Sequence, residues 1–375
     1  MPMLEMIRHA NSARHALPAI LLGALIAATS AAADIIKVED IRHGITTTRA
    51  QCAATAQTVW LTVDGEDFCV RYYLSTAGGE GSRPVVFLSG DYSGSVNLKT
   101  WQWVPTASDK RAGVAFDPTE RAIDTDELVK TADAFSKMAK TTAIYLARIG
   151  IGGTSGRHVF RKTLLEQHLM NAALDAIKQS HGFEGFHLAG QSGGSTLVAA
   201  LAGTRRDIAC VVAGSGRLVA SRDTGAKDPA HTLSDPTRSI AAIARNATLR
   251  FMVVTDRADR NVPVGEQTAF VDRLRRAGRD VPQYFVAAID EYHHGVMSYA
   301  ELVAAGCVLG RSDAEIGLAV ATMVKRNAAY NAQRRKEAAL FGKGGIAKPG
   351  VASQPAADPP VAPAGGRARP GANGA

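Results

Sequence analysis

The stretch HLAGQSGGST, residues 187–196, decides the fold, because it places a serine among glycines directly after a short apolar run. Gly190, Ser192 and Gly194 form the pattern Gly-x-Ser-x-Gly, which is typical of a sharp turn from a strand into a helix that exposes one hydroxyl. The pattern alone is weak, since a chain of 375 residues with 36 glycines contains roughly 0.2 such matches by chance. The neighbouring elements must therefore decide whether Ser192 is a nucleophile.

Short apolar runs alternate with longer amphipathic patterns on both sides of this stretch. The apolar runs predict strands over 83–90, 142–150, 186–190, 208–216, 249–256 and 282–290. The amphipathic patterns predict helices over 125–140, 159–180, 193–202, 239–246 and 263–278, and a final one from a Ser312–Glu315 capping box to about residue 341. Buried strands separated by crossover helices predict an α/β fold with a mostly parallel sheet and helices on both faces. Ser192 then lies between a strand and a helix.

The four cysteines bear on the N-terminal region and on the core. Residues 58–75, TVWLTVDGEDFCVRYYLS, alternate like a β-hairpin that turns at Asp64-Gly65. Cys52 and Cys69 flank the first strand of this hairpin, and we predict a disulfide between them, with two separate thiols as the alternative. Cys210, inside the apolar run ACVVAG, is expected to be a buried thiol that acts as a small hydrophobic residue. The sequence does not place Cys307.

Residues 1–33 are typical of a secretory signal peptide. Arg8 and Arg14 precede an apolar run over 16–28, and small residues up to Ala33 offer a cleavage site. The run is too short to span a bilayer, so we expect a secreted or periplasmic protein without a stable membrane anchor. An uncleaved anchor is the alternative.

The charge distribution separates the C-terminal tail from the rest of the chain. Of the formal charge of +8, a surplus of five lies in residues 331–375, and residues 34–330 carry a surplus of only two. A nearly neutral core argues against nucleic acid as a partner. Residues 342–375 are rich in Ala, Pro and Gly and are expected to be disordered, which leaves residues 34–341 as one large domain.

A nucleophilic serine needs a base within hydrogen-bond reach and an acid that orients this base. Of the histidines after Ser192, His231 lies in a polar loop, whereas His293 and His294 follow the last predicted strand in DEYHHGV. The carboxyl ends of parallel strands lie at one edge of a sheet, so these two histidines should lie at the same edge as Ser192. Either of them can serve as the base.

The acid is expected in TDRADRNVP, which follows the predicted strand 249–256 and contains Asp256 and Asp259. Serine, aspartate and histidine then occur in this order, each at the end of a different strand. Alternatively, the aspartates are turn residues and the histidines a solvated or metal-binding pair. No third metal ligand stands at a recognisable spacing, so no metal is predicted.

Over roughly residues 70–325 the sequence resembles the α/β-hydrolase superfamily. DRADRNVP is similar to the acid loop of that superfamily, and the match gives Asp259 the place of the acid, while Asp256 stands where glycine is usual. His294, followed by Gly295, matches the base better than His293. ARIGIGGTSG (147–156) is similar to the glycine-rich turn after the fourth core strand of the family, and residues 190–216 are similar in cadence to prolyl-oligopeptidase-type serine peptidases and secreted esterases.

The resemblance also implies an oxyanion hole. One donor is the amide of Gly193, and a second comes from the loop SGDYSGS (89–95), where Asp91 or Tyr92 stands in place of the usual His-Gly form. The carboxylate of Asp91 would be unfavourable there unless it points away. Trp101 and Trp103 either form the wall of an acyl pocket or pack under a long loop.

The resemblance implies an exported serine hydrolase that cleaves carboxylic esters through an acyl-enzyme, without a cofactor, on a small-molecule or peptide acyl substrate. The alternative is a prolyl-oligopeptidase-like peptidase. The N-terminal hairpin region of about 50 residues is too short for the propeller that such peptidases carry. A non-catalytic binding protein with the same fold is a third possibility.

Overall fold

The computed structural model of the protein describes residues 35–37, 40, 43–91, 95–97, 99, 101–104, 123–219, 226–290 and 292–341. The predicted signal peptide and the predicted tail lie outside these residues. The secondary structure predicted from 83 to 341 agrees with the main observed elements, with differences at their ends. One further helix and three short strands, over 95–97, 102–104 and 123–124, were not predicted.

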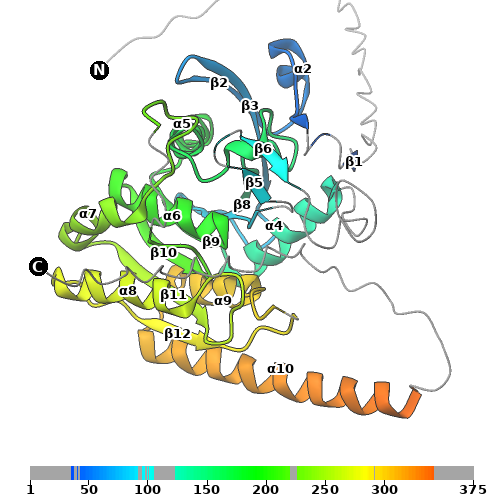
Figure 1. Ribbon diagram of the computed structural model, residues 1–375, viewed down its shortest axis with the longest axis vertical. Coiled ribbons are helices and arrows are strands. Elements are labelled where there is room, and N and C mark those ends of the chain that lie inside the picture. Colours follow the sequence, from blue (N-terminus) through cyan, green and yellow to red (C-terminus); the bar gives the residue numbers. More distant parts are fainter. Residues whose placement is uncertain are drawn as a thin grey trace, which may run out of the picture. The chain divides into compact units, whose positions relative to one another are not determined.

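An eight-stranded sheet has the strand order β12-β11-β10-β9-β4-β8-β3-β2 (Figure 1). Its strands are β2 (Thr58–Val63), β3 (Glu66–Ser75), β4 (Val85–Leu88), β8 (Ala143–Leu146), β9 (Phe186–Gln191), β10 (Ile208–Gly214), β11 (Arg250–Asp256) and β12 (Gln283–Val286). The strands from β12 to β8 pair in parallel, whereas β3 pairs antiparallel with both β8 and β2. The α/β fold predicted from the sequence, with its mostly parallel sheet, is confirmed.

Two short ladders lie outside the main sheet. β1 (Ile35–Ile36) pairs antiparallel with β7 (Ile123–Asp124), and β5 (Ser95–Asn97) pairs antiparallel with β6 (Gln102–Val104). β12 is shorter than the run predicted over 282–290, because the chain leaves the sheet after Val286 and the amide of Ala288 donates to Asp256 Oδ2 (2.7 Å).

The N-terminal hairpin is formed by β2 and β3. Asp64 and Gly65 make its turn with φ values of 50° and 85°, the left-handed pair that a two-residue hairpin turn requires. A disulfide joins Cys69 in β3 to Cys52 in the short helix α2 (Arg49–Ala54). The bridge therefore ties α2 to the hairpin.

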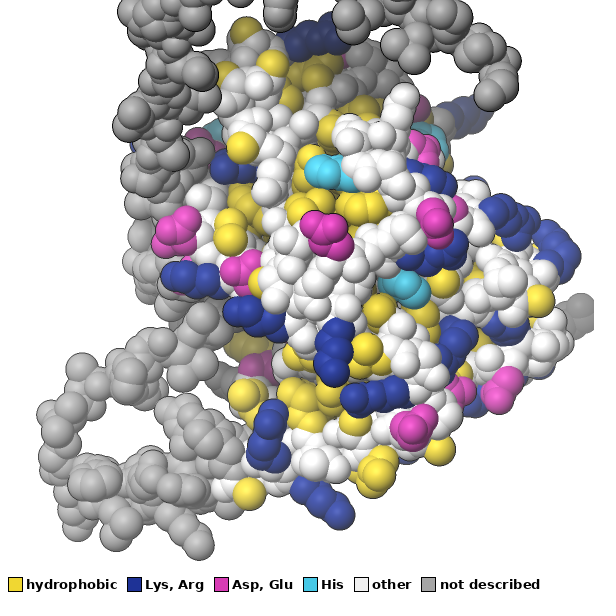
Figure 2. Space-filling model, turned by 180° about the vertical axis from the view of Figure 1, so that it is seen from behind, with side chains coloured by type: hydrophobic (Ala, Val, Ile, Leu, Met, Phe, Trp, Pro, Cys, Tyr) yellow, Lys and Arg dark blue, Asp and Glu magenta, His cyan; other side chains and the backbone are white. Residues whose placement is uncertain are grey.

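On the face of the molecule opposite the view of Figure 1, Lys and Arg side chains lie among Asp and Glu side chains rather than in one continuous patch (Figure 2). None of the helices in the described part of the chain has an apolar stretch long enough to cross a membrane.

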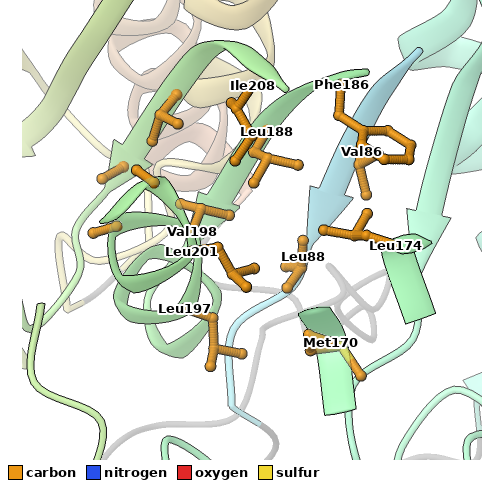
Figure 3. Packing of buried hydrophobic residues seen from close by; sticks show 14 of the residues in the cluster. Val86, Leu88, Met170, Leu174, Phe186, Leu188, Leu197, Val198, Leu201 and Ile208 are labelled. Atoms are coloured by element: carbon orange, nitrogen blue, oxygen red, sulfur yellow. The ribbon is translucent and has the colours of Figure 1, made fainter. Parts of the chain in front are cut away.

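Helices cover both faces of the sheet, as predicted. Beyond α2 they are α4 (Thr125–Ala139), α5 (Leu164–His181), α6 (Gly193–Thr204), α7 (Ile240–Arg245), α8 (Val264–Arg276), α9 (Met297–Val308) and α10 (Asp313–Phe341), with the 3-10 turns η1 (His158–Phe160) and η2 (Pro236–Ser239). Side chains alternate along each strand, so Val86 and Leu88 of β4 pack with α5 to α8, whereas Val85 and Phe87 pack with α4, α9 and α10. Figure 3 shows the first of these two cores.

Helix ends follow their capping residues. α5 begins at Leu164, later than predicted, because Thr163 Oγ1 accepts the amide of Glu166 (3.3 Å) and the residues before it form η1. At the start of α10, Ser312 Oγ accepts the amide of Glu315 (3.3 Å), and Glu315 Oε2 accepts the amide of Ser312 (2.7 Å). This is the predicted capping box.

The pattern did not predict helix α9, and the expectation for Cys210 was wrong. Cys210 in β10 forms a disulfide with Cys307 near the end of α9, so it is not a free thiol. α9 is buried along most of its length, and an apolar run of this kind has no polar stripe that marks it as a helix. The two partners are 97 residues apart in the chain, which hides the pairing from sequence inspection.

Candidate active site

Ser192 occupies a strained turn between β9 and α6. Its φ of 55° and ψ of −119° are unusual for a residue with a side chain. The turn holds because the amide of Ser192 donates to Gly214 O (2.8 Å). A Cβ on Gly190 would lie 2.5 Å from the Gly194 carbonyl carbon, and a Cβ on Gly194 would lie 2.1 Å from Leu88 O. Both glycines are therefore required for the close approach of backbone in this turn.

Asp259 and His294 form a buried pair at the same edge of the sheet. Asp259 lies in the loop after β11, and His294 in the loop after β12. Nδ1 of His294 lies 3.0 Å from Asp259 Oδ2 and 3.1 Å from Oδ1. The carboxylate also accepts the amides of Asn261 and Val262, both at 2.9 Å. The acid is thus fixed by its own loop and orients the imidazole with Nε2 left for another partner.

The loop that carries His294 is held by Asp290 and Gln191. The Asp290 carboxylate accepts the amides of Tyr292 (3.0 Å), His294 (3.1 Å) and Gly295 (2.6 Å). Gln191 Nε2 donates to the carbonyl of His294 (3.1 Å). Because Gln191 directly precedes Ser192, this bond brings the histidine loop to the serine turn. Ser192 Oγ makes no hydrogen bond to a described residue.

His293 and Asp256 form a second, more exposed pair. Nδ1 of His293 lies 3.2 Å from Asp256 Oδ2, and the His293 side chain is 39% exposed, against 10% for His294. The Asp256 carboxylate accepts the amides of Ala258 (2.8 Å) and Ala288 (2.7 Å). Asp256 therefore joins the loops after β11 and β12, whereas Asp259 contacts the imidazole of His294.

The amide of Gly193 is the first oxyanion donor that the sequence analysis predicted. It is the first residue of α6, and neither its N–H nor that of Asp91 donates to any residue that the structure describes. Tyr92, the other predicted donor, lies outside the described residues. The Asp91 carboxylate does not point away from the turn, since a Cβ on Gly193 would collide with Asp91 Oδ1.

Three cations neutralise the Asp91 carboxylate. Arg148 Nη1 binds its Oδ1 (2.8 Å), while Lys162 Nζ (2.5 Å) and Arg161 Nε (3.2 Å) bind its Oδ2. Burial raises the pKa of the Asp91 carboxyl, but the charges of Lys162, Arg148 and Arg161 more than offset this and hold the pKa well below its usual range. Sequence reasoning missed this cluster, since its members come from separate segments and match no motif.

Arg148 is the centre of the cluster. Its fully buried guanidinium binds Glu166 of α5 through Nε (3.0 Å) and Nη2 (2.8 Å), and it also donates to Ser89 O (3.1 Å). Arg148 therefore holds both the backbone and the acidic side chain of the loop after β4.

Of the two predicted pocket tryptophans, the structure describes the side chain of one. Trp101 is almost fully buried, and its ring contacts those of Phe160 (5.8 Å between centroids) and His231 (5.0 Å). This favours the packing alternative for Trp101. The side chain of Trp103 lies outside the described residues. Within the described part of the chain, no group of three or more His, Cys, Asp or Glu side chains is arranged to hold a metal ion.

No known family model matches the chain, and no curated protein sequence matches it. Solved structures are similar to it at low identity. An esterase of Pyrococcus furiosus has 12% identity and a TM-score of 0.46, over 70% of this chain and 93% of that one. A serine hydrolase homologue of Coxiella burnetii has 14% identity and a TM-score of 0.43, over 67% and 96%. The acylaminoacyl peptidase of Pyrococcus horikoshii has 12% identity and a TM-score of 0.43, over 65% and 39%.

Proposed function

We propose that this protein is an exported serine hydrolase that cleaves carboxylic esters, with Ser192 as nucleophile, His294 as general base and Asp259 as the orienting acid. The observation that carries the proposal is the buried His294–Asp259 pair, which Gln191 ties to the strained turn of Ser192. The three residues follow β9, β12 and β11, whose carboxyl ends lie together at one edge of the sheet.

The reaction takes two steps. Ser192 Oγ attacks the acyl carbon while its proton passes to His294 Nε2, and the carbonyl oxygen becomes an oxyanion facing the amides of Gly193 and Asp91. The oxyanion collapses, the ester C–O bond breaks, and His294 gives its proton to the leaving alcohol. Water then attacks the acyl-enzyme with His294 as base, which releases the acid and restores Ser192. Asp259 stabilises the imidazolium in both steps.

Export is supported by the cysteines. All four cysteines of the chain are paired, as Cys52–Cys69 and Cys210–Cys307. Stable disulfides form in oxidising compartments outside the cytosol. The proposal predicts a mature N-terminus at Asp34, to be read by mass spectrometry of the exported protein. An N-terminus at Met1 in the exported fraction would contradict cleavage.

Labelling with a fluorophosphonate probe tests the nucleophile. The wild type should be labelled and Ser192→Ala should not. Ser215→Ala is a matched control: Ser215 follows the neighbouring strand β10, also has a positive φ of 46°, and its buried Oγ has no hydrogen-bond partner among the described residues. A folded wild type that is not labelled would contradict the hydrolase and favour a binding protein.

A substrate panel separates esters from peptides. We expect p-nitrophenyl esters to be turned over faster than aminoacyl p-nitroanilides, because p-nitrophenoxide is a better leaving group than p-nitroaniline. Faster turnover of the anilides would make the protein a peptidase.

A further inference from the structure

Ser195, three residues after the proposed nucleophile, is a fully buried serine in the first turn of α6. Its hydroxyl oxygen lies 2.6 Å from the carbonyl oxygen of Gly190 and 2.7 Å from that of Gly214. A hydroxyl carries one hydrogen, so Ser195 shares this hydrogen between the two carbonyl groups. One side chain thus joins the end of β9 to the end of β10.

These two carbonyl groups flank the strained turn of the nucleophile. Gly190 lies two residues before Ser192, and Gly214 is the last residue of β10, the strand that pairs in parallel with β9. The carbonyl of Gly214 also accepts the amide of Ser192 (2.8 Å), and the carbonyl of Ser192 accepts the amide of Ser195 (3.0 Å). Ser195 therefore holds the backbone of Ser192 on both sides, directly at its carbonyl and through Gly214 at its amide.

The packing around Ser195 leaves its side chain little freedom. A Cβ on Gly216 would lie 2.3 Å from the Cβ of Ser195 and 3.3 Å from the carbonyl oxygen of Ser192. The chain after β10 therefore packs its backbone against this side of α6, and a side chain at residue 216 would displace Ser195. Because Ser195 is fully buried, bulk water does not compete for its hydroxyl, and its hydrogen bonds are stronger than they would be at the surface.

Ser192 needs such support, because a residue keeps a φ of 55° with a ψ of −119° only where its surroundings impose them. We propose that Ser195 is a positioning residue for the nucleophile: its hydroxyl fixes the ends of β9 and β10, and so keeps Ser192 in the conformation that presents Oγ to the acyl carbon. This role rests on the proposed function, in which Ser192 attacks the substrate. A displacement of about 1 Å in a reacting atom can lower a rate about 100-fold.

Ser195→Ala tests this role, because it removes only the hydroxyl oxygen and adds no atom to the packed interior. Thr196→Val is the matched control. Thr196 is the next residue of α6, is also buried, and donates its hydroxyl to the carbonyl of Arg217 (3.0 Å), again in the chain that follows β10. Within the described structure this carbonyl accepts no hydrogen bond from Ser192. Thr196→Val therefore removes a bond of the same kind without releasing the nucleophile.

For p-nitrophenyl acetate we expect Ser195→Ala to lower kcat about 30-fold, with KM changed less than about twofold. Thr196→Val should stay within about twofold of the wild type in both constants. The rate constant for inactivation by a saturating fluorophosphonate should fall in Ser195→Ala by a factor similar to that for kcat, because the same oxygen attacks the phosphorus. Both variants should lower the midpoint of thermal unfolding, since each loses a buried hydrogen bond.

Three results would overturn the proposal: an unchanged kcat in Ser195→Ala, an equal loss of kcat in Thr196→Val, or a rise in KM at unchanged kcat. The first would leave the hydroxyl a purely structural role, and the second would assign the effect to α6 as a whole. Fluorophosphonate labelling distinguishes this failure from failure of the proposed function. If the wild type is labelled and Ser195→Ala keeps its kcat, only the role of Ser195 is wrong. If the folded wild type is not labelled, the hydrolase and the role of Ser195 both fail.

Discussion

Two Asp–His pairs lie side by side at the carboxyl edge of the sheet, and they differ in the solvent exposure of their histidine side chains. His294 and Asp259 are both buried, whereas the His293 side chain is 39% exposed over a buried Asp256. Water competes for the exposed imidazole and screens its charge, so its carboxylate can hold and stabilise an imidazolium less effectively. An aspartate–histidine pair is therefore not by itself a mark of catalysis.

The carboxylates of the two aspartates also accept hydrogen bonds from different parts of the chain. Asp256 accepts amides from the loop after β11 and from residue 288 after β12, and so braces one loop against the other. Asp259 accepts amides only from its own loop, two and three residues further on, and directs the rest of its carboxylate at His294. We infer that one pair orients a base and the other holds the site together.

Replacing each histidine is the most direct test of whether only the His294–Asp259 pair acts in catalysis. We expect His294→Ala to lower kcat by about 10⁶-fold, because the serine loses its base. His293→Ala should lower it by less than about fivefold, since only a brace is lost. The measurement is ester hydrolysis under saturating substrate, and the reverse order of effects would make His293 the base.

Replacing the two aspartates should also lower kcat unequally, with a smaller loss than for His294→Ala. Asp259→Asn should lower kcat by about 10⁴-fold, because an amide there favours the wrong tautomer of His294. Asp256→Asn removes a charge but keeps an acceptor oxygen, so kcat should fall by less than about tenfold, while the midpoint of thermal unfolding decreases. Equal losses of kcat in the two variants would show that the pairs act as one unit.

Asp290 gives a further test of the two pairs, since its carboxylate holds the loop that carries both histidines. Asp290→Ala removes the acceptor of three loop amides, so His294 is less well placed, and we expect kcat to fall about 100-fold. Asp272→Ala is the control, because Asp272 is an exposed residue of α8 paired only with Arg275 within the described structure. An Asp290→Ala protein with full activity would mean that Gln191 alone positions the loop.

The smallest expected effect on kcat comes from Glu301, one turn into α9. Burial raises the pKa of this carboxyl to about 7. The folded protein therefore holds its proton at pH values where the unfolded chain has lost it, and the free energy of unfolding decreases as the pH rises from about 4.5 to 7. Glu301→Gln should stabilise the protein by about 3 kcal/mol at pH 8 and hardly at pH 4, with kcat unchanged.

Urea unfolding at the two pH values measures this effect. Equal effects of Glu301→Gln at pH 4 and pH 8 would contradict it. The two histidine variants can also be made in the Glu301→Gln protein. If the ratio of kcat between His293→Ala and His294→Ala changes there, α9 rather than solvent exposure distinguishes the two pairs.

The sheet and the order of the proposed catalytic residues follow from local patterns in the sequence. Apolar runs with crossover helices predicted the parallel strands, and the glycines around Ser192 predicted its turn. Residue types alone left both His293 and His294 open as the base, because adjacent residues in one loop differ mainly in which way they face, and only the family resemblance favoured His294. The Arg148 cluster and the Cys210–Cys307 bridge depend on segments far apart in the chain, which no spacing rule brings together.

The Cys210–Cys307 bridge has a consequence for the time scale on which the site moves. The histidine loop follows β12, an edge strand, and edge strands of a sheet are among the first elements to open. On its other side the loop runs into α9, which the bridge fastens to β10 inside the sheet. Opening of β12 alone thus leaves one end of the loop anchored. The amides that Asp290 binds should then exchange their hydrogens more slowly than those of β12 itself.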